Sequence, residues 1–574
     1  MSIRILPPDV VSKIAAGEVV ERPASVVKEL IENAIDAGAK EIKVEIREGG
    51  QRLVRVGDDG VGIPAAEVEL AFARHSTSKI SSPEDLERIV TLGFRGEALA
   101  SIAAVSHLTM LTRAEGEEMG TWMRLEGGHI IRRESRGALP GTVVSVENLF
   151  FNVPARRKFL RQTATEAGHA SEVVTFYALA FPALRFQFVK DGRLVFRSTG
   201  SGELFDVLIK VYGLQTARQM VPLREEERLS DMQVEGYVSP PGLSRASRDH
   251  LIFFVNRRHV RDRLLSRAVI EAYHTLLPGD RYPIAILYVS LPSEQVDVNV
   301  HPAKSEIRFL NPDEVFHTVQ RAVRHTLKAS SPLQALSAPP HRGEFPLPSP
   351  RLRREEGELT LALEVQRPAE QEISLQAPTL GTRLPMLRVL GQVGQTYIIA
   401  EGPDGLYLID QHTAHERVLY ERLRAEKDRL IDSAQHLLTP LTLELTPRQQ
   451  ETLAACLEEI AALGFEIEPF GGETHLVRAV PAILAGKDIS AALIDLLDAL
   501  AEGGEPEEEA LLDQALTTLA CHGAVRAGKT LSLEEMRDLI RQLEKTQLPH
   551  TCPHGRPIMK HLSTELLARE FGRR

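Results

Sequence analysis

The chain has 574 residues and a formal net charge of −11, and 43% of its residues are hydrophobic. A chain of this length exceeds what one hydrophobic core supports, so about three domains are expected. The negative charge excludes a protein coated in nucleic acid, and any DNA contact must come from local basic patches. Neither a secretory leader nor a long apolar span is visible, which predicts a cytoplasmic protein that does not enter a membrane. Three cysteines are too few for a disulfide framework, which leaves metal binding or burial for them.

The segment KELIENAIDAGA at 28–39 predicts an amphipathic helix with two polar groups on one face. Glu29 and Asn33 lie four residues apart among apolar residues. The amide oxygen of Asn33 suits a Mg²⁺ ion whose other ligands are phosphate oxygens and water. The carboxylate of Glu29 suits a general base that takes a proton from an attacking water. The pair therefore indicates phosphoanhydride hydrolysis, whereas a helical Glu alone is more often part of a solvated ion pair.

A second segment, DDGVGI at 58–63, follows a strand-like run. Asp58 can accept a hydrogen bond from an exocyclic amine at the end of that strand. Gly60 and Gly62 allow the backbone to lie against a flat base where a side chain would collide. This combination indicates an adenine pocket, although an Asp-Gly pair alone is usually a turn.

A third segment, GFRGEAL at 93–99, stands before the helical run expected over 97–104. Backbone N–H groups at a helix start can face phosphate oxygens. The segment therefore predicts a phosphate-binding loop, in which a positive side chain adds charge; the loop residues are Gly93, Phe94, Arg95 and Gly96.

The order and spacing of the three segments resemble the ATPase superfamily shared by DNA gyrase, the large heat-shock chaperone, sensor histidine kinases and MutL. The resemblance implies an α/β fold (an α+β sandwich), in which a Bergerat-type ATPase domain builds a helix-on-sheet pocket for ATP and Mg²⁺ instead of a P-loop.

Further segments are similar to the MutL family in particular: IAAGEVVERPASVVKEL at 14–30, HSTSK at 75–79, NLFFNVPARRKFL at 148–160, FFVNRRHVRDRLL at 253–265 and VDVNVHPAKSEIRF at 296–309. In the last of these, alternating apolar residues predict two strands on either side of a His-Pro turn, which holds Lys304 at a loop tip. The resemblance implies that Lys304 reaches the terminal phosphate, that Thr142 lies near the adenine, and that Lys79 belongs to a lid over the nucleotide.

The stretch from about Ser330 to Pro385 is rich in Pro, Ser and charge and has no sustained period, which predicts a flexible linker. The expected domains are an ATPase domain at 1–205, an α/β transducer domain of ribosomal-S5-like type at 206–329, the linker at 330–385 and a C-terminal α/β domain for dimerisation and nuclease activity at 386–574. A subdomain is expected to be inserted in the last of these at about 440–505.

The C-terminal part opens with two expected strands, VGQTYIIA and GLYLID, followed by DQHTAHERVLYERL. Asp410 ends a strand and precedes a helix, on which His412 and Glu416 share one face as metal ligands require. Glu421 lies further round the helix. ACHGAVRAG at 520–528 and TCPHGRP at 551–557 add thiolate and imidazole groups on Cys521, Cys552 and His554. Taken singly, such residues are more often surface pairs or buried small hydrophobes.

The combination resembles the nuclease-competent branch of the MutL family, whose signature is Asp-Gln-His-Ala, two residues, Glu, four residues, Glu. Thr413 stands where the family has Ala, outside the expected ligands. The resemblance implies a Zn²⁺ or Mn²⁺ site that nicks DNA, with Asp410 and Glu416 catalytic and the ligands drawn from Asp410, His412, Glu416, Cys521, Cys552 and His554.

The sequence GAVRAGKT at 523–530 satisfies the P-loop pattern, but its context argues against that function. Apolar residues recur at helical spacing just before it, where a P-loop needs a buried strand. Ser532 and Glu535 instead predict the capping box of a following helix.

Partner interactions are expected from two weaker signals. QHLLTP at 435–440 resembles the family's segment for docking on the replicative sliding clamp, through Gln435, Leu438 and Pro440. Two basic clusters can contact DNA phosphates without reading sequence: Arg156, Arg157, Lys158 and Arg161, and Arg257, Arg258, Arg261 and Arg263.

The family resemblance implies a homodimeric ATP-driven clamp that couples mismatch recognition by MutS to strand removal in DNA mismatch repair, with a nick made by the chain itself. The alternative is an ATP-gated matchmaker whose C-terminal metal is structural. A type II topoisomerase subunit and a chaperone are disfavoured by the thiol and imidazole groups of the C-terminal part and by the absence of a toprim-like acid cluster.

Overall fold

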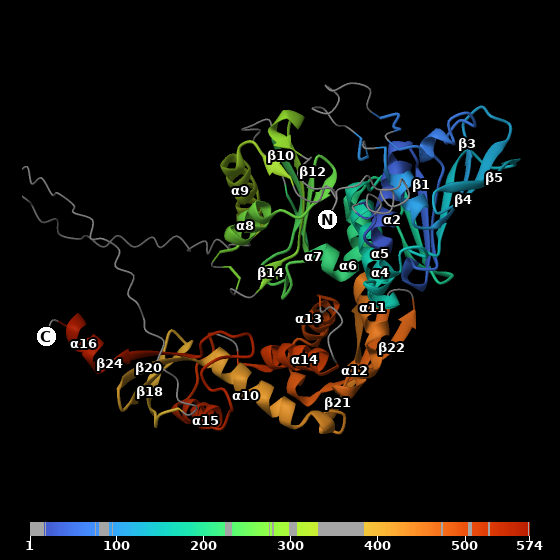
Figure 1. The fold of residues 1–574 in the computed structure, drawn as a ribbon. Helices are drawn as coiled ribbons and strands as arrows, with labels where there is room; N and C mark the ends of the chain where they lie inside the picture. The colour runs from blue at the N-terminus through green and yellow to red at the C-terminus, as the bar shows by residue number, and fades with distance from the viewer. Residues whose placement is uncertain are drawn as a thin grey trace, which may run out of the picture.

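The computed structural model describes residues 17, 19–74, 76–79, 91–93, 96–223, 232–274, 276–277, 281–297, 307–330, 384–471, 474–502, 508–525, 528–571 and 573. Residues 331–383, which hold most of the expected linker, lie outside these ranges. Figure 1 shows an N-terminal unit and a middle unit next to each other, with a C-terminal unit below both. Within the described ranges, no helix combines the length and the apolar character that crossing a membrane requires.

The described part of the N-terminal unit is built on an eight-stranded mixed sheet. Its strands are β1 (Glu41–Arg47), β2 (Leu53–Asp58), β3 (His107–Arg113), β4 (Gly120–Glu126), β5 (His129–Arg136), β6 (Gly141–Glu147), β7 (Arg185–Lys190) and β8 (Arg193–Arg197). Their order is β5-β4-β3-β6-β2-β1-β7-β8, with β1 and β7 parallel and the other neighbours antiparallel. The expected helix-on-sheet fold is therefore confirmed in this unit.

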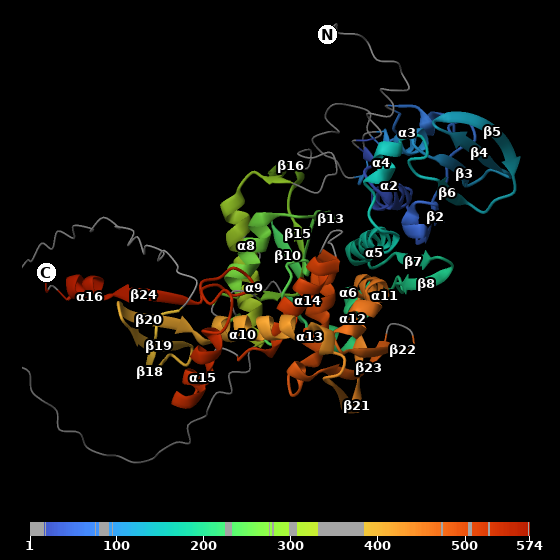
Figure 2. The ribbon, with the colours of Figure 1, turned by 60° about the horizontal axis from the view of Figure 1, so that its bottom comes forward.

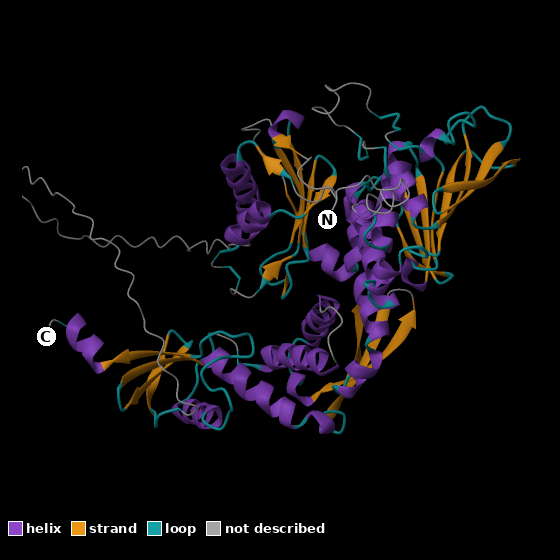
Figure 3. Ribbon diagram, viewed as in Figure 1, coloured by secondary structure: helices purple, strands orange, loops and turns teal. Residues whose placement is uncertain are grey.

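Helices cover this sheet, as the purple and orange ribbons of Figure 3 show. They are α2 (Pro23–Asp36), α3 (Ala98–Ala104), α4 (Pro154–Lys158), α5 (Thr163–Ala180), α6 (Leu204–Tyr212) and α7 (Leu214–Gln219), with short 3-10 helices η1 (Glu48–Gly50) and η2 (Leu70–Phe72). Helix α2 begins with Pro23 in its first turn, where the missing N–H costs nothing. Its apolar face is buried, and each of its large aliphatic side chains contributes about 1.5–3 kcal/mol on burial.

The middle unit contains a five-stranded sheet in the order β13-β12-β15-β10-β9. The elements of this unit are β9 (Val221–Leu223), β10 (Gln233–Val238), β11 (Ser244–Arg245), β12 (Leu251–Val255), β13 (Arg258–Val260), α8 (Arg263–Ala272), β14 (Tyr282–Pro283), β15 (Ala285–Ser290), η4 (Ser293–Gln295), β16 (Val296–Asp297), β17 (Arg308–Phe309) and α9 (Pro312–Ser330). Alternate residues of β12 and β15 pack on α8 and α9 on one face and on the core of the N-terminal unit on the other. The sheet therefore joins the two units through one of its faces.

The C-terminal unit has two cores. The distal core surrounds a four-stranded sheet in the order β18-β19-β20-β24. Its elements are β18 (Arg388–Val393), β19 (Tyr397–Gly402), β20 (Gly405–Asp410), α15 (Leu533–Leu543), β24 (Met559–Ser563) and α16 (Thr564–Glu570). The expected strand VGQTYIIA is wrong in its first half, because residues 394–396 form the turn between β18 and β19. Gly394 and Gln395 adopt positive φ there, which ends the extended run.

The proximal core of the C-terminal unit surrounds a three-stranded sheet in the order β21-β23-β22. Its elements are α10 (Gln411–Ala425), η5 (Lys427–Arg429), β21 (Ala434–Glu444), α11 (Pro447–Ala455), α12 (Leu457–Ala462), β22 (Glu466–Gly471), β23 (Thr474–Pro481), η6 (Ala482–Leu484), α13 (Ile489–Glu502) and α14 (Glu508–Gly523). Figures 1 and 2 show α10 running from the distal sheet toward the proximal core. One helix therefore belongs to both cores.

The proximal core docks on the other two units, and both views place α11 below α5. Arg448 of α11 binds Glu172 of α5 at 3.3 Å and Asp249 of the middle unit at 2.7 Å. Lys190 of β7 pairs with Glu451 of α11. These ion pairs join segments more than 190 residues apart in the sequence.

Two buried aspartates of α13 complete this interface. Asp498, 9% exposed, binds His250 Nε2 of the middle unit at 2.9 Å and Gln449 of its own unit at 2.7 Å. Asp495, 1% exposed, pairs with Arg281 of the middle unit and accepts from the amide of Ala246 at 3.2 Å. Burial alone raises the pKa of each carboxyl, but His522 and Arg281 at Asp495, and His250 and Gln449 at Asp498, outweigh it and hold both pKa values below the usual range. The interface is therefore charged, and both aspartates of α13 are buried in it.

Candidate functional site

The residues of the expected nucleotide site converge at one end of α2. Glu29 and Asn33 lie on this helix, and both are partly buried. Lys79 Nζ donates to Asn33 Oδ1 at 3.0 Å and pairs with Asp36 of the same helix. The structure thus brings Asn33 and Lys79 together, although 46 residues separate them in the sequence.

Asp58 and Thr142 face each other across β2 and β6, where they are register partners. Asp58 Oδ1 accepts from the Gly60 amide at 2.9 Å, and the hydroxyl of Thr142 lies 2.9 Å from that of Thr112. Burial raises the pKa of Asp58, against hydrogen bonds from the backbone amides of Gly60 and Thr142 that lower it. The carboxyl and hydroxyl groups therefore offer a partly desolvated set of hydrogen-bonding atoms.

The two acids of the Asp-Asp pair have different roles. Asp59 Oδ1 accepts from the amides of Lys40 and Glu41, at 2.7 and 2.8 Å, and so fixes the start of β1. Asp58, in contrast, accepts from the amides of Gly60 and Thr142, in its own turn and on the neighbouring strand. Of the two acids, Asp58 is therefore the candidate for binding the adenine ring.

The glycines of this segment are required by neighbouring backbone. A Cβ at Gly60 would lie 2.8 Å from the carbonyl oxygen of Ala37, at the end of α2. Gly62 adopts φ +71°, and its Cβ would lie 2.0 Å from the carbonyl oxygen of Arg113. The backbone therefore passes between α2 and β3 at a distance that only glycine allows.

The described part of the phosphate-loop segment lies against the same cluster. A Cβ at Gly93 would approach Lys79 Nζ to 3.0 Å and Asn33 Oδ1 to 3.8 Å. Gly96, at φ +63°, leaves no room for a Cβ beside the carbonyl oxygen of Ser76 at 2.5 Å. The expected helix begins at Ala98, directly after this segment. Phe94, Arg95 and Lys304 lie outside the described residues.

Sequence reasoning did not find Asp36, which organises this cluster. Its Oδ1 accepts from the amide of Leu92 at 2.9 Å, and its Oδ2 accepts from the amide of Gly93 at 3.0 Å. The same carboxylate pairs with Lys79. The signal was available in the sequence, because Asp36 follows Asn33 by three residues and shares its helix face.

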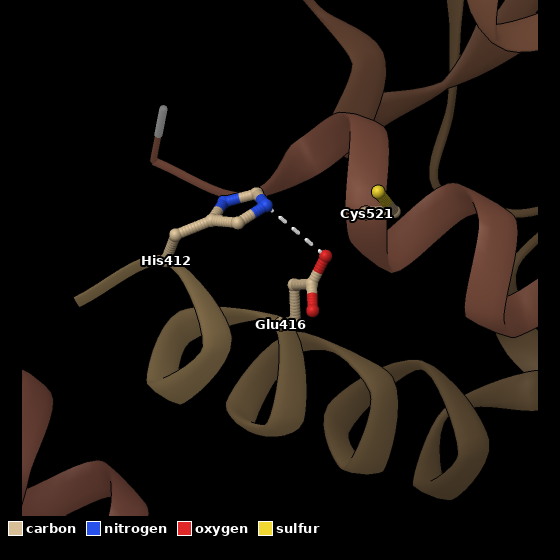
Figure 4. A group of neighbouring side chains, drawn as sticks. All are labelled: His412, Glu416 and Cys521. Atoms are coloured by element: carbon tan, nitrogen blue, oxygen red, sulfur yellow. Dashed lines mark ion pairs between the residues drawn. The ribbon is translucent and has the colours of Figure 1, made fainter. Parts of the chain in front are cut away.

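The second candidate site lies at the start of α10 (Figure 4). His412 and Glu416 share one face, with His412 Nε2 lying 3.2 Å from Glu416 Oε1, and Cys521 of α14 faces them. Candidate ligand atoms of His412, Glu416 and Cys521 all lie within 4.8 Å of one another, and the same holds for Glu416, Cys552 and His554. Glu416 belongs to both groups. The structure therefore gathers five of the six expected ligands around one carboxylate.

Glu416 is a buried carboxylate, only 1% exposed. Burial raises its pKa, but interactions with His412, His554 and Cys521 outweigh burial, so its pKa lies well below the usual range. Its Oε2 atom has no hydrogen-bond partner and lies 3.7 Å from His554 Nδ1. A buried anionic oxygen without a hydrogen bond costs stability unless a cation neutralises it, so this atom fits a metal ion.

The tautomer of His412 also fits a metal. Its Nδ1 lies 3.0 Å from the carbonyl oxygen of Val525, which can only accept, so Nδ1 carries the proton. Nε2 then faces Glu416 Oε1, to which it donates when protonated, and it offers a lone pair to a metal ion once that proton is lost. Fixing the ring through its other nitrogen is usual for metal-binding histidines.

Cys552 and His554 form a thiol and imidazole pair beside Glu416. Burial raises the pKa of Cys552, but the His554 side chain and the backbone amides of Arg556 and His554 outweigh it, and the net shift is downward. Interactions with Cys552 and Glu416 raise the pKa of His554 to about 9. The neighbouring groups thus favour deprotonation of Cys552 and Glu416, which is the form that binds metals, whereas His554 holds its proton near neutral pH and would have to release it to bind a metal.

Helix α10 holds the two segments that carry the cysteines. The amide of Val525 donates to His415 Nδ1 at 2.9 Å, and the carbonyl of Val525 accepts from His412 Nδ1 at 3.0 Å. Two histidines of α10 therefore hold the backbone four residues after Cys521. Arg417 Nε donates to the carbonyl of Thr551 at 2.6 Å, and Glu421 accepts from the amides at 547 and 548. Sequence reasoning missed His415 and Arg417, and placed Glu421 on the helix without a role. Their partners lie more than 100 residues away.

Asp410 caps α10 and is not in either group of ligand atoms among the described residues. Its Oδ1 accepts from the amides of His412 and Thr413 at 2.9 and 3.1 Å. Thr413 is buried, and its hydroxyl donates to the carbonyl of Asp410. The departure from the family pattern therefore adds one hydrogen bond at the helix start and touches no ligand.

The remaining sequence motifs have these positions. Helix α14, not a strand, ends at Gly523, and Ser532 and Glu535 form the expected capping box, so the P-loop pattern has the wrong context. Gln435, Leu438 and Pro440 lie in β21 at an irregularity in its pairing with β23, and the Leu438 side chain is fully exposed.

The two basic clusters are only partly on the surface. The exposed members are Arg157, Lys158, Arg257, Arg261 and Arg263, whereas Arg156 and Arg161 are half-buried. Arg258 is buried, with its guanidinium bound to main-chain carbonyls, so the expectation that it contacts DNA is wrong.

Three family models match this chain. That for the "Histidine kinase-, DNA gyrase B-, and HSP90-like ATPase" matches residues 21–136, "DNA mismatch repair protein, C-terminal domain" matches residues 208–328, and "MutL C terminal dimerisation domain" matches residues 390–531. Together they identify an ATP-binding ATPase domain and a C-terminal dimerisation domain.

Relatives extend over the whole chain. The DNA mismatch repair protein MutL of Desulforudis audaxviator is 42% identical over 579 residues, which cover 100% of this chain and 99% of that protein. The protein of the same name from Geotalea daltonii is 38% identical over 598 residues, with 100% and 99% covered. A solved structure of the ATPase domain from the bacterial mismatch repair endonuclease Aquifex aeolicus MutL is 30% identical, covers 48% of this chain and 91% of that one, and has a TM-score of 0.35. The chain belongs to the MutL family of DNA mismatch repair proteins.

Proposed function

We propose that this mismatch repair protein is an ATP-driven dimeric clamp, which couples mismatch recognition by MutS to strand removal, and that its C-terminal unit nicks DNA at a metal centre. The observation that carries the nuclease is the buried Glu416, with His412, Cys521, Cys552 and His554 around it. Thiolate and imidazole ligands suit Zn²⁺, and the carboxylate also suits Mn²⁺.

In the proposed nucleotide site, Glu29 takes the proton of the attacking water and Asn33 binds the Mg²⁺ of Mg-ATP. Asp58 and Thr142 bind the adenine, and Lys79 belongs to the lid. Lys79 Nζ is bonded to the Asn33 oxygen, so a Mg²⁺ ion bound to that oxygen requires the ammonium group to move away. The Gly93 segment, together with Phe94, Arg95, Gly96 and Lys304, would contact the phosphates.

At the proposed metal centre, the ligands are His412, Glu416, Cys521, Cys552 and His554, joined by Asp410. A bound Zn²⁺ or Mn²⁺ supplies an activated water and stabilises charged phosphate oxygens. The residues of this chain hold that ion at a fixed place, because α10 grips both cysteine segments.

DNA approach is proposed along the exposed members of the basic clusters, which would contact phosphates without reading sequence. The fully exposed Leu438, flanked by Gln435 and Pro440, is proposed to dock on the sliding clamp. An apolar side chain of this exposure on a strand irregularity suits insertion into a partner's pocket. As in its family, the protein is proposed to act in the cytoplasm.

A second candidate function is that of a matchmaker with a purely structural metal. It is favoured by the number of protein ligands near Glu416, because a site closed by four protein ligands leaves no position for water. In this reading ATP alone drives the clamp, and another protein cuts the strand.

Nicking of supercoiled plasmid in Mn²⁺ separates the two. The wild type is compared with Asp410→Asn, which retains a side-chain oxygen for the helix cap and is therefore expected to fold. The nuclease proposal expects nicking by the wild type and its loss in the variant at equal metal content. Equal nicking by both proteins would point to a contaminant, and no nicking by the wild type with ATP and sliding clamp would favour the structural metal.

A further inference from the structure

The turn at Thr91, Leu92 and Gly93 is held by side chains from two different units. From α2, Asp36 accepts from the amides of Leu92 and Gly93 at 2.9 and 3.0 Å. From β13 of the middle unit, Arg258 donates through Nη1 to the carbonyl of Leu92 at 3.2 Å and through Nη2 to the carbonyl of Thr91. The Thr91 hydroxyl donates to the carbonyl of Gly93 at 2.8 Å. Side chains thus provide hydrogen-bond partners for both the amides and the carbonyls of this irregular segment.

The guanidinium group suits this task better than any other side chain. Its planar fork presents several N–H donors in fixed directions, so it binds two successive carbonyls at once. Arg258 is 8% exposed, and a buried cation is retained only where it has partners. A role in binding DNA phosphates is incompatible with this position, whereas the neighbouring Arg257 is exposed.

The turn lies beside the groups proposed to handle ATP. Gly93 approaches Asn33 and Lys79 so closely that a Cβ there would lie 3.8 Å from Asn33 Oδ1. Arg258 also shares its surroundings with Tyr177 of α5, whose hydroxyl donates to Glu32 at 2.6 Å, and the charges of Glu32, Glu29 and Arg258 all act on that hydroxyl. The charge of Arg258 therefore acts on the same tyrosine as that of Glu29, the expected general base.

We propose that Arg258 is a positioning residue for ATP hydrolysis, through which the middle unit sets the shape of the turn at 91–93 and thereby the place of Gly93 beside Asn33 and Lys79. Asp36 binds the amides of the turn and Arg258 binds its carbonyls, so the turn keeps this shape only when the middle unit is seated on the N-terminal unit. The inference rests on the proposed nucleotide site at Glu29 and Asn33.

Steady-state ATPase kinetics and nucleotide binding in the full chain test this. Arg258→Gln retains length and a donor but loses the charge and the fork, and we expect kcat/KM for ATP to fall about tenfold or more. Arg258→Lys restores the charge without the fork and should recover part of the loss. Arg324→Gln is the matched control, because it removes an exposed arginine from α9 of the same unit, and it should behave as the wild type.

Two readouts separate positioning from a merely structural role. Amide hydrogen exchange of Leu92 and Gly93 should rise in Arg258→Gln while the Tm stays within a few degrees of the wild type. Arg258→Ala should regain activity when a small guanidinium compound is added at millimolar concentration. A wild-type kcat/KM in Arg258→Gln would overturn the inference, as would a loss of activity that follows the Tm without faster exchange at 92 and 93.

If Arg258→Gln does not fold, Arg258→Lys decides: normal kinetics and exchange in a folded Lys variant would also overturn the inference. Failure of the underlying site is distinguished by Glu29→Gln. Undiminished ATP hydrolysis in Glu29→Gln would show that Glu29 is not the general base. If Glu29→Gln loses hydrolysis while the Arg258 variants hydrolyse ATP normally, only the positioning role of Arg258 is contradicted.

Discussion

The proposed nucleotide site and the proposed metal centre are assembled in opposite ways. At the nucleotide site, α2, β2, β6 and the turn at 91–93 each contribute one or two groups, and a residue of the middle unit closes the set. At the proposed metal centre, α10 provides two candidate ligands, His412 and Glu416, and also binds both segments that carry the cysteines. The first site depends on how two units are seated on each other, whereas the second depends mainly on the integrity of α10.

The largest expected effects test whether the two sites are independent. Glu416→Gln removes the buried charge shared by both ligand groups, so metal affinity should fall about 100-fold or more, while ATP binding is unchanged. Asn33→Ala should do the reverse and abolish Mg-ATP binding at unchanged metal content. Elemental analysis and calorimetry with a non-hydrolysable nucleotide measure both quantities in each variant. Loss of nucleotide binding in Glu416→Gln would contradict the comparison.

An intermediate effect is expected at the interface that joins the C-terminal unit to the others. In Asp498→Asn, the side chain can no longer accept from both His250 and Gln449, so one buried donor loses its partner. Removing one member of a buried charged pair costs about 3–5 kcal/mol, and the proximal core should undock. Small-angle scattering should then show a larger radius of gyration. Glu458→Gln, an exposed residue of α12, is the control for lost charge, and equal radii in both variants would contradict the prediction.

The smallest effect concerns pH at the contact between the N-terminal and middle units. His259 stacks on Phe176 of α5 at 3.9 Å between ring centroids, and burial, with Arg261 and Lys28, lowers its pKa to about 3. The unfolded chain therefore binds the proton first, and stability falls as pH drops from about 6.5 toward the folded value, by about 2 kcal/mol at pH 5.

His259→Phe keeps the stacking and removes this titration. Between pH 7 and pH 5 its Tm should fall less than that of the wild type, whereas His436→Gln, at an exposed position, should follow the wild type. His169, whose pKa burial lowers to about 4, leaves part of the acid sensitivity in place. An identical fall in Tm for His259→Phe and wild type would show that His259 does not contribute.

The placement of side chains on an element could be predicted from the sequence where it depends on residues within that one element. Glu29 and Asn33 share a helix face, as do His412 and Glu416, and Ser532 caps its helix through Glu535, because local spacing determines these relations. Prediction failed for Arg258, which reads as one more surface cation in a basic run. Its hydrogen-bond partners are carbonyls 166 and 167 residues away, which the neighbouring sequence does not indicate.

Two other features were hidden for related reasons. The hairpin turn at 394–396 was read as strand because apolar residues surround it, while the positive φ of Gly394 and Gln395 depends on the pairing of β18 with β19. The charged interface at Asp495 and Asp498 looks in the sequence like the solvated face of a helix. The two aspartates can be recognised as interface residues only from their partners, His250 and Arg281, which belong to the middle unit.

Helix α10 has a practical consequence for anyone who wishes to divide the protein into fragments. Its first half packs in the distal core through Ala414 and Val418, and its second half packs in the proximal core through Leu419 and Leu423. Deleting the proximal core to isolate the proposed metal centre would expose Leu419 and Leu423 of α10, the helix that carries the candidate ligands His412 and Glu416. A fragment that begins before β18 and keeps both cores is the smallest unit in which this chemistry can be studied apart from ATP.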